Sequence, residues 1–407
     1  MGLTRYPSYK PSGIEWIGEI PSHWQPLRLK YLGTLYNGLT GKGASDFNQA
    51  GNPGNKAFIP FKNIANNFRI DPANLESVSI VDDDRQNQVE KNDIFFMMSS
   101  ENYEDVGKSS ILSSDLGETY LNSFCRGFRV HHADVNPLFL NYLLGGSSYR
   151  QRLLVEANGF TRINLKVEKV NDHIVVMPPI AEQTAIAAYL DEKTAQIDKL
   201  IAAKQRMIEL LREERQAVIN EAVNGEGKKG WVRRKLKYVA RLQSGEFITS
   251  EQIKPEGQYP VYGGNGFRGC TDTFTHDGNY ILIGRQGALC GNINYANNKF
   301  FASEHAVVVT ILDKEDEILW LGELLRSMNL NQYSLASAQP GLSVERIENL
   351  EIQYTSTEEQ KSVVKNIRSV INREQKNIER LERELSLLSE WRSTLISEIV
   401  TGKFKVA

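Results

Sequence analysis

The chain has 407 residues, of which 41% are hydrophobic and 24% are charged, a composition that excludes a disordered or fibrous protein. Lys and Arg number 48 against 50 Asp and Glu, so a polyanion has to be bound through local basic patches. Apolar runs fall far short of the roughly 18 residues that span a bilayer, and the N-terminal residues lack the apolar core of a signal peptide. Three widely spaced cysteines fit reduced thiols. We therefore expect a cytoplasmic protein without a membrane partner, and the length predicts about two to three domains.

The chain contains an internal repeat. Residues 24–32 (WQPLRLKYL) are matched by residues 231–239 (WVRRKLKYV), 207 positions later. Residues 181–183 (AEQ) are matched by residues 358–360 (EEQ), 177 positions later, and this second match continues without a gap. Because the two offsets differ, one module is present twice with an insert of different length in each copy.

The two inserts, residues about 25–175 and 232–352, alternate short strand-like runs with turns and end in helices. The first is expected to form strands at residues 56–64, 93–98 and 128–130, and short helices within residues 137–154. The second is expected to form strands at residues 258–262, 279–283 and 305–310, and a helix at residues 317–328.

Each copy closes with one long helix. The prolines of residues 178–179 precede the first helix, and Ser356 with Glu359 has the spacing of a capping box before the second. Gly225 and Gly402 follow the ends, where glycine is the usual residue. The roughly 43 residues between these signals would extend about 65 Å, a length that indicates a coiled coil.

Apolar residues recur at alternating steps of three and four along both helices, which predicts a seam between them. The predicted seam consists of Leu190, Ile197, Ile201, Ile208, Leu211, Val218, Ile367, Ile371, Ile378, Leu381, Leu385, Leu388, Leu395 and Ile399. Because duplicated modules usually pair about a two-fold axis, we expect the helices to run antiparallel with the inserts at opposite ends. The alternative is a buried helix pair that only holds the fold together.

The predicted fold class is α+β, with two globular domains of mixed α/β structure and twisted sheets. Two long antiparallel coiled-coil helices separate these domains in a pseudo-two-fold internal repeat. The expected boundaries are residues 1–177 for the first globular domain, 178–225 for the first helix, 226–354 for the second globular domain, and 355–407 for the second helix with a C-terminal tail.

Several motifs imitate catalytic sites but are better explained otherwise. Residues 264–269 (GNGFRG) have the spacing of a dinucleotide fingerprint, yet no apolar helix follows them. Residues 38–43 (GLTGKG) are too short for a phosphate-binding loop. His131 and His132 are the only clustered imidazoles, and residues 82–84 (DDD) favour a solvated turn over a cation site. We expect no catalytic site, metal or cofactor in this chain.

The chain resembles the specificity (S) subunits of type I DNA restriction–modification systems. The resemblance is carried by residues 6–24 (YPSYKPSGIEWIGEIPSHW), by residues 179–183 (PIAEQ), by the repeated tryptophan segment, and by residues 339–343 (QPGLS) before the second long helix. It covers essentially the whole chain. The first copy has residues 161–165 (TRINL) where the second has residues 338–342 (AQPGL), so this loop differs between the copies.

The resemblance implies that each insert is a target recognition domain that reads one half of a bipartite, asymmetric sequence in double-stranded DNA. The long helices would set the spacer and dock two methyltransferase (M) subunits, which bind S-adenosylmethionine and modify adenine N6. ATP- and Mg-dependent restriction (R) subunits can join such complexes, and the S subunit itself catalyses nothing. Two alternatives stay open from the residues alone: a two-headed protein-interaction scaffold, and a DNA-binding decoy without a methyltransferase.

The insert loops are rich in Gly, Asn, Gln, Tyr and Arg. Amide and guanidinium groups can read adenine and guanine edges, although such loops also occur in other α/β proteins. The residues predicted to contact base edges are Asn102, Arg162, Asn265, Arg285, Gln286 and Gln339. Those predicted to contact phosphates are Lys42, Lys62, Lys108 and Arg268, whereas Tyr103 and Tyr262 are predicted to pack against a sugar or a distorted base.

Overall fold

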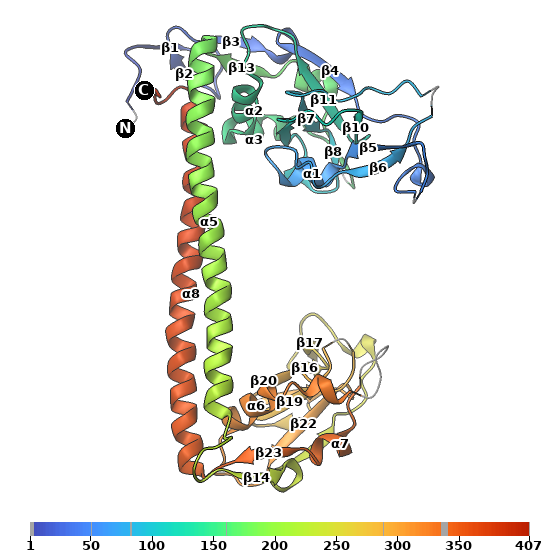
Figure 1. Ribbon diagram of the computed structural model, residues 1–407, viewed down its shortest axis with the longest axis vertical. Helices are drawn as coiled ribbons and strands as arrows, with labels where there is room; N and C mark the ends of the chain where they lie inside the picture. The colour runs from blue at the N-terminus through green and yellow to red at the C-terminus, as the bar shows by residue number, and fades with distance from the viewer. Residues whose placement is uncertain are drawn as a thin grey trace. The chain divides into compact units, whose positions relative to one another are not determined.

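The computed structural model describes residues 4–49, 51–81, 84–159, 161–287, 289–334 and 341–406. The chain divides into two compact units, Met1–Ala203 with Glu384–Ala407, and Lys204–Arg383. Two helices of 44 residues, α5 (Ile180–Val223) and α8 (Thr357–Val400), each contribute to both units (Figure 1). The predicted α+β class with two mixed domains and two long helices is confirmed. The predicted four-segment division stays a prediction.

Among the described residues, the first unit combines five small sheets, three of them two-stranded, with four short helices. Its main sheet has the order β4-β11-β7-β9 and is antiparallel throughout, and a second sheet has the order β10-β5-β6. Its strands are β1 (Tyr9–Pro11), β2 (Glu19–Pro21), β3 (Gln25–Arg28), β4 (Gly33–Asn37), β5 (Asn55–Ile59), β6 (Glu76–Ser79), β7 (Ile94–Met97), β8 (Ser99–Ser100), β9 (Ser109–Ile111), β10 (Thr119–Leu121), β11 (Cys125–Val130), β12 (Ile163–Asn164) and β13 (Ile174–Met177). Its helices besides α5 and α8 are α1 (Phe61–Asn66), α2 (Pro137–Gly145), α3 (Ser147–Val155), α4 (Val167–Asn171) and the 3₁₀ turns η1 (Leu29–Tyr31), η2 (Ala44–Asp46) and η3 (Tyr103–Asp105).

One predicted strand in the first insert is partly wrong. The strand expected at residues 56–64 ends at Ile59, and helix α1 follows Pro60. Pro60 lacks an N–H for a strand ladder, and its φ of −72° is compatible with the start of a helix. The helix is then anchored by Asn63, whose side-chain amide donates to the backbone oxygens of Asp71 and Asn74, both at 2.9 Å.

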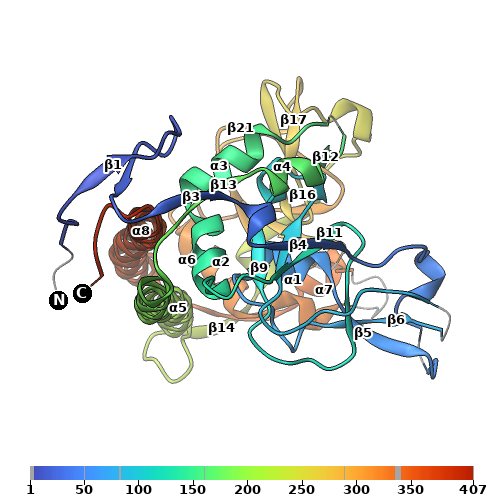
Figure 2. The same cartoon turned by 90° about the horizontal axis from the view of Figure 1, so that it is seen from above.

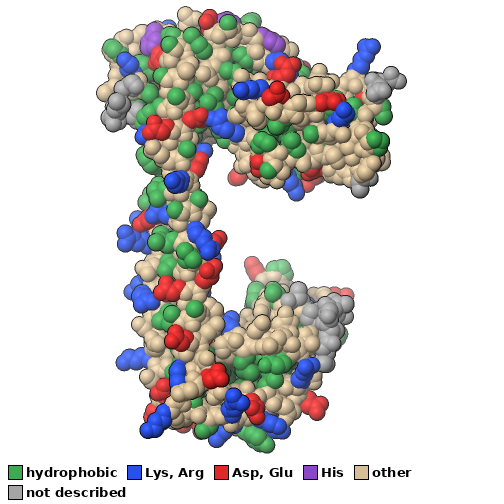
Figure 3. Space-filling view, in the orientation of Figure 1, with side chains coloured by type: hydrophobic (Ala, Val, Ile, Leu, Met, Phe, Trp, Pro, Cys, Tyr) green, Lys and Arg blue, Asp and Glu red, His purple; other side chains and the backbone are tan. Residues whose placement is uncertain are grey.

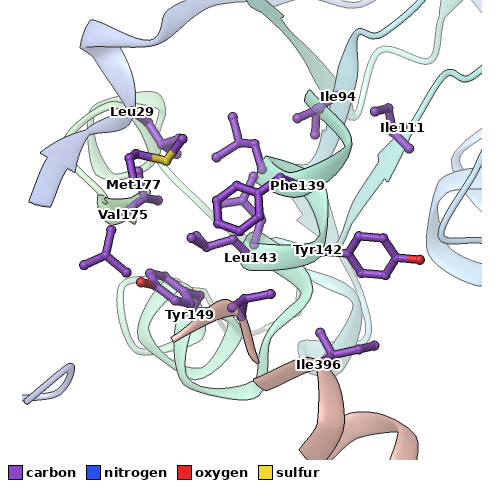
Figure 4. Close-up of a cluster of buried hydrophobic side chains, with 14 of the residues drawn as sticks. Leu29, Ile94, Ile111, Phe139, Tyr142, Leu143, Tyr149, Val175, Met177 and Ile396 are labelled. Carbon is purple, nitrogen blue, oxygen red and sulfur yellow. The ribbon is translucent and has the colours of Figure 1, made fainter. Parts of the chain in front are cut away.

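Helix α2 is apolar on nearly every side, because the main sheet, α3 and the end of α8 pack around it. In Figure 4, Phe139 and Leu143 lie at the centre of the buried cluster, with Ile396 of α8 beside it. The other labelled side chains around them are Leu29, Ile94, Ile111, Tyr142, Tyr149, Val175 and Met177. Residues of α2, of the main sheet and of both long helices therefore share one hydrophobic core. Burying one such side chain stabilises the fold by roughly 1.5–3 kcal/mol.

The second unit has two four-stranded sheets, ordered β15-β22-β19-β20 and β17-β16-β21-β18. Its strands are β14 (Val232–Lys235), β15 (Ala240–Ser244), β16 (Tyr259–Gly263), β17 (Gly266–Thr271), β18 (His276–Asp277), β19 (Tyr280–Gly284), β20 (Ile293–Ala296), β21 (Lys299–Ala302), β22 (Ala306–Ile311) and β23 (Glu351–Tyr354). Its short helices are α6 (Ile318–Ser327) and α7 (Val344–Glu348), with 3₁₀ turns η4 (Leu236–Tyr238), η5 (Ser250–Gln252) and η6 (Leu330–Tyr333).

The internal repeat is visible in the strand pairing. Strand β3 pairs antiparallel with β13, and β14 pairs in the same way with β23. The partner of Arg28 is Ile174, and the partner of Lys235 is Glu351. The two strand pairs therefore have the same register. In each copy, the segment that matches at offset 207 pairs with a segment that matches at offset 177, so the two sequence matches belong to one structural unit.

Within each unit, the beginning of one long helix packs beside the end of the other. In the first unit, Arg392 of α8 contacts Asp198 of α5 at 2.8 Å. In the second unit, Ile219 and Val223 near the end of α5 share a core with Ile367 near the start of α8. Figure 2 shows α5 and α8 end-on, with the β1–β2 hairpin beside the end of α8. All fourteen predicted seam residues are buried or partly buried, and their role as a seam stays a prediction.

Candidate nucleic-acid interface

A hollow of about 490 Å³ opens on the surface of the second unit. It is lined by Gly264, Asn265, Arg268, Gln286, Gly287, His305 and Gly341. Three residues predicted to bind DNA, Asn265, Arg268 and Gln286, lie together here and are all exposed. The GNGFRG motif that contains two of them forms the turn of the β16–β17 hairpin and the start of β17 rather than a dinucleotide loop.

Backbone hydrogen bonds bring the loops around this hollow together. The N–H of Arg285 donates to the carbonyl of His305 at 2.8 Å, and the N–H of Leu342 donates to the carbonyl of Arg285 at 2.9 Å. A β-bridge also joins Gln286 to Gly341. The loop after β19 is therefore fixed on both sides, by the residue before β22 and by the segment before α7.

Glycine is required where the β16–β17 turn meets the end of β19. A Cβ atom on Gly284 would lie 2.1 Å from the carbonyl oxygen of Gly264. Any side chain at Gly284 would therefore push the two loops apart and alter the floor of the hollow.

The first unit contains the equivalent loop junction. The N–H of Met98 donates to the carbonyl of Phe124 at 3.1 Å, and the N–H of Leu165 donates to the carbonyl of Met98 at 2.8 Å. Strands β8 and β12 pair beside these bonds, as Gln286 and Gly341 do in the second unit. Two divergent inserts thus build the same junction between the same three segments.

Three predicted residues gather around this junction. Asn102 and Tyr103 follow β8 in the chain and are exposed, and the hydroxyl of Tyr103 donates to the carbonyl of Leu154 at 2.8 Å. Arg162 precedes β12, and its guanidinium lies 4.8 Å from the ring centroid of Phe124 and 3.5 Å from the carboxylate of Glu101. These side chains form a second polar surface with both hydrogen-bond donors and acceptors.

The predicted phosphate contacts in the first unit differ in how available they are. Lys42 forms an ion pair with Asp84, which lowers the pKa of that carboxyl, and the Lys42 side chain is only 9% exposed. Lys108 forms an ion pair with Asp105 at 2.6 Å. Lys62 is exposed on α1 and lines a separate hollow of about 440 Å³. Asp82 and Asp83 of the aspartate run lie outside the described residues.

The remaining predicted residues do not all face the hollow. Arg285 is half-buried, and its guanidinium donates to Ser244 Oγ at 3.2 Å. The Cys290 thiol donates to the backbone carbonyl of Arg285 at 3.4 Å, and burial raises the pKa of this thiol. Tyr262 packs edge-on against Phe300 with ring centroids 5.7 Å apart. Gln339 lies outside the described residues.

Sequence reasoning missed three residues at these junctions, Glu101, Phe124 and His305. Phe124 and His305 each directly precede an equivalent central strand, β11 or β22. The sequence gives little indication of these two positions, because the inserts share no sequence motif there. Only the shared hydrogen bonds show that these two positions correspond.

Within the described part of the chain, no group of three or more His, Cys, Asp or Glu side chains could hold a metal ion. In that same part, no helix is both long enough and apolar enough to cross a membrane.

The sequence profile of a family described as "Type I restriction modification DNA specificity domain" matches residues 21–210 and 228–385. The chain belongs to this family. Each matched region contains one of the two loop junctions, so both specificity domains of the chain carry an equivalent site.

Curated relatives of these specificity domains include the EcoprrI specificity subunit of Escherichia coli, which is 43% identical over 31% of this chain and 33% of the relative. The EcoKI specificity subunit of E. coli K12 is 27% identical over 53% of this chain and 45% of that relative. The matched stretches therefore span less than half the length of either curated relative.

Two solved structures share the fold over 94% of this chain and 98% of theirs, each at 14% identity. One, with a TM-score of 0.74, comes from work on complex assembly and conformational transition of the type I R-M system. The other, with a TM-score of 0.54, is the HsdS subunit from Thermoanaerobacter tengcongensis.

Proposed function

We propose that this chain is the sequence-specific DNA-recognition subunit of a type I restriction–modification complex. Each specificity domain would read one half of a bipartite, asymmetric target in double-stranded DNA. The observation that carries the proposal is the pair of equivalent loop junctions, each surrounded by exposed amide and guanidinium side chains. Such groups make the paired hydrogen bonds that distinguish purine edges in the major groove.

The different side chains at the two junctions support an asymmetric target. Arg162 and Asn102 lie at the first junction, whereas Gln286, Asn265 and Arg268 lie at the second. The backbone arrangement is shared, so the chemical difference lies in the side chains. Each domain would therefore read a different short sequence.

The long helices would set the gap between the half-sites and dock two methyltransferase subunits. Apolar side chains are exposed on both helices, among them Met207 and Leu210 of α5 and Leu387 and Trp391 of α8, each 49–55% exposed. Figure 3 shows hydrophobic side chains among the charged ones along these helices. Exposed apolar surface rimmed by charge is typical of protein-binding faces.

In this proposal the chain recognises DNA and its partners carry out the chemistry. The methyltransferase subunits would bind S-adenosylmethionine and modify adenine N6, and restriction subunits would use ATP and Mg²⁺. The balanced charge of the chain, 48 basic against 50 acidic residues, suits a subunit that shares the phosphate backbone with basic partner surfaces.

The test is single-molecule sequencing of the host genome for N6-methyladenine, with and without this gene. We expect one motif of two defined half-sites across a fixed gap to lose methylation on deletion and to regain it on complementation. If every methylated motif is unchanged, salt-dependent binding of the purified complex to a library of duplexes decides the question. Binding without preference for any half-site would contradict the proposal and favour a protein-interaction scaffold.

A further inference from the structure

Arg162 is a preoriented guanidinium at the first junction. It stacks on Phe124, with the guanidinium carbon 4.8 Å from the ring centroid, and Phe124 is 41% exposed. The aromatic ring limits the directions in which the guanidinium plane can face. The Arg162 side chain is still 49% exposed, so its N–H groups can reach a ligand.

The backbone that presents Arg162 is also held in place. Asn158 and Asn164 exchange two backbone hydrogen bonds of 3.0 and 2.8 Å, which close the loop between them. Gly159, with a φ of +147°, lies so close that a Cβ atom there would be 2.0 Å from the carbonyl oxygen of Arg162. On the other side, the N–H of Phe124 donates to Asn122 Oδ1 at 2.9 Å. Both members of the stacked pair therefore start from fixed backbone positions.

The chemistry of Arg162 selects among the four bases. A guanidinium carries only donors, and guanine alone presents two adjacent acceptors, N7 and O6, in the major groove. Adenine offers one acceptor beside a donor, thymine offers one acceptor beside a methyl group, and cytosine offers a donor. A preoriented arginine therefore favours guanine.

Glu101 argues against a phosphate as the ligand of Arg162. Its carboxylate lies 3.5 Å from the guanidinium and is 81% exposed. A phosphate bound at the same guanidinium would lie beside this negative charge and be repelled. A base edge is neutral, and the carboxylate can accept a hydrogen bond from the amino group of a cytosine paired with the guanine.

The second unit has different side chains at the corresponding positions. His305 occupies the place of Phe124, because both carbonyls accept the same backbone hydrogen bond. In the sequence, Gln339 stands 177 positions after Arg162, at the same offset as the helix match, although it lies outside the described residues. The stacked arginine is thus a feature of the first unit's recognition surface.

We propose that Arg162 reads a guanine in the half-site bound by the first unit, and that Phe124 is the positioning residue that holds Arg162 for this contact. This inference rests on the proposed function, because it names a base within the target of that same site.

The experiment uses the complex that contains the full chain and duplexes that carry its methylated motif. Each guanine of both half-sites is replaced in turn by 7-deazaguanine, which lacks the N7 acceptor, or by inosine, which retains N7 and O6. We expect one guanine at which 7-deazaguanine weakens binding about tenfold and inosine does not. Arg162→Ala should weaken binding to the unmodified duplex about 5- to 150-fold and make binding insensitive to 7-deazaguanine at that position.

The control arginine is Arg152 on α3, whose side chain is 41% exposed and is paired with a glutamate, Glu156, at 2.7 Å. Arg152→Ala should leave the 7-deazaguanine effect unchanged. The role of Phe124 is tested by the ratio of the affinities for the unmodified and the 7-deazaguanine duplex. Phe124→Leu should lower this ratio about two- to fivefold, and Phe124→Tyr should retain it. Binding to the other half-site and the melting temperature should be the same in both Phe124 variants, which separates positioning from folding.

Three results would overturn the proposal. The first is that no guanine in either half-site responds to 7-deazaguanine in an Arg162-dependent way while both half-sites are still recognised, which leaves the proposed function intact. The second is an equal loss on cognate and scrambled duplexes with Arg162→Ala, which identifies a phosphate contact. The third is that the unsubstituted complex shows no half-site preference, which overturns the proposed function as well.

Discussion

Gln360 accepts a hydrogen bond from the backbone N–H of Glu317 at 2.9 Å, and Gln183 makes the matching bond to Asn136 at 2.8 Å in the other copy. Both glutamines are fully buried in the first turn of a long helix. Each uses its amide nitrogen to bind the backbone just before that helix, Pro178 in the first copy and Thr355 in the second. The repeated Glu-Gln signature therefore fastens each long helix to the start of the neighbouring short helix.

Replacing either glutamine should loosen only its own unit. Gln183→Ala removes the acceptor of the partly buried N–H of Asn136, which costs about 1–3 kcal/mol. Hydrogen–deuterium exchange should show faster exchange in α2 for Gln183→Ala and in α6 for Gln360→Ala. The exposed Gln196→Ala is the control and should change neither helix. Equal effects of one variant on both units would contradict this local role.

His173 should make the first unit sensitive to acid. Burial lowers its pKa to about 4, and its ring stacks on Trp16 with the ring centroids 5.8 Å apart. Among the residues that the structure describes, its Nε2 has no hydrogen-bond partner. The unfolded chain binds a proton near pH 6.5, so the free energy of unfolding falls as the pH drops from about 6.5 to 4. The total loss is about 3 kcal/mol, because each unit of pKa difference corresponds to about 1.4 kcal/mol.

The variant His173→Leu tests this pH dependence. Leucine is the residue at the corresponding position of the second copy, Leu350, where its carbonyl accepts the same hydrogen bond as that of His173. The free energy of unfolding of the first unit, measured in urea, should then fall less between pH 7 and pH 4 in the variant than in the parent. His132→Gln, at an exposed position, should keep the parental slope, and a parental slope in His173→Leu would refute the assignment.

Asp93 should be the most sensitive charged residue of the first unit. Its carboxylate is 2% exposed and accepts two hydrogen bonds from Arg129, at 3.0 and 2.7 Å, and one from Tyr36 at 2.6 Å. Burial and the neighbouring carboxylate both raise the pKa of Tyr36, so its hydroxyl stays protonated as a donor. Asp93→Ala leaves the half-buried Arg129 guanidinium and the Tyr36 hydroxyl without their buried acceptor and should cost about 3 kcal/mol.

The comparison for Asp93 is Glu90, which pairs with the same guanidinium at 2.6 Å but is 65% exposed. Glu90→Ala should cost less than about 1 kcal/mol, because exposed ion pairs contribute little. Chemical unfolding followed by near-ultraviolet circular dichroism measures both variants. Similar losses in the two would show that burial does not decide the strength of this pair.

Gly284→Ala should relax sequence recognition by the second unit alone. The added methyl group would overlap the carbonyl of Gly264 and separate the loops around the hollow. Methylome sequencing should then show relaxed sequence preference in one half-site and an unchanged preference in the other. Gly287→Ala separates backbone strain from the steric effect, because φ there is +93° while a Cβ atom would lie within 4 Å of no non-adjacent residue that the structure describes.

Arg268 should act on affinity rather than on sequence preference. It is exposed in the hollow, and no acidic side chain in the described part of the chain forms an ion pair with it. Arg268→Gln should weaken binding to all duplexes alike. It should also reduce the slope of the logarithm of the binding constant against the logarithm of the salt concentration by about one. Gln286→Ala should instead relax one base position by about 1–3 kcal/mol. A sequence-dependent loss with Arg268→Gln would reassign it to a base edge.

The sequence by itself determined the duplicated organisation and the two long helices. Those features follow from local rules: proline at 178–179 fits a helix start, and Gly402, at φ +74°, closes α8 with the two backbone bonds of a Schellman motif. The spacing of apolar residues likewise selected positions that are buried or partly buried in α5 and α8.

Only the tertiary structure decided which side chains meet at the recognition surfaces. Lys42 is neutralised by Asp84 and Arg285 turns toward Ser244, and neither contact is visible in the local sequence because the partner lies 42 or 41 positions away. Phe124 meets Arg162 only because β11 lies beside β7 in the sheet and β12 pairs with β8 just beyond it. Strand register sets such meetings, and register depends on the packing of the whole core rather than on any short motif.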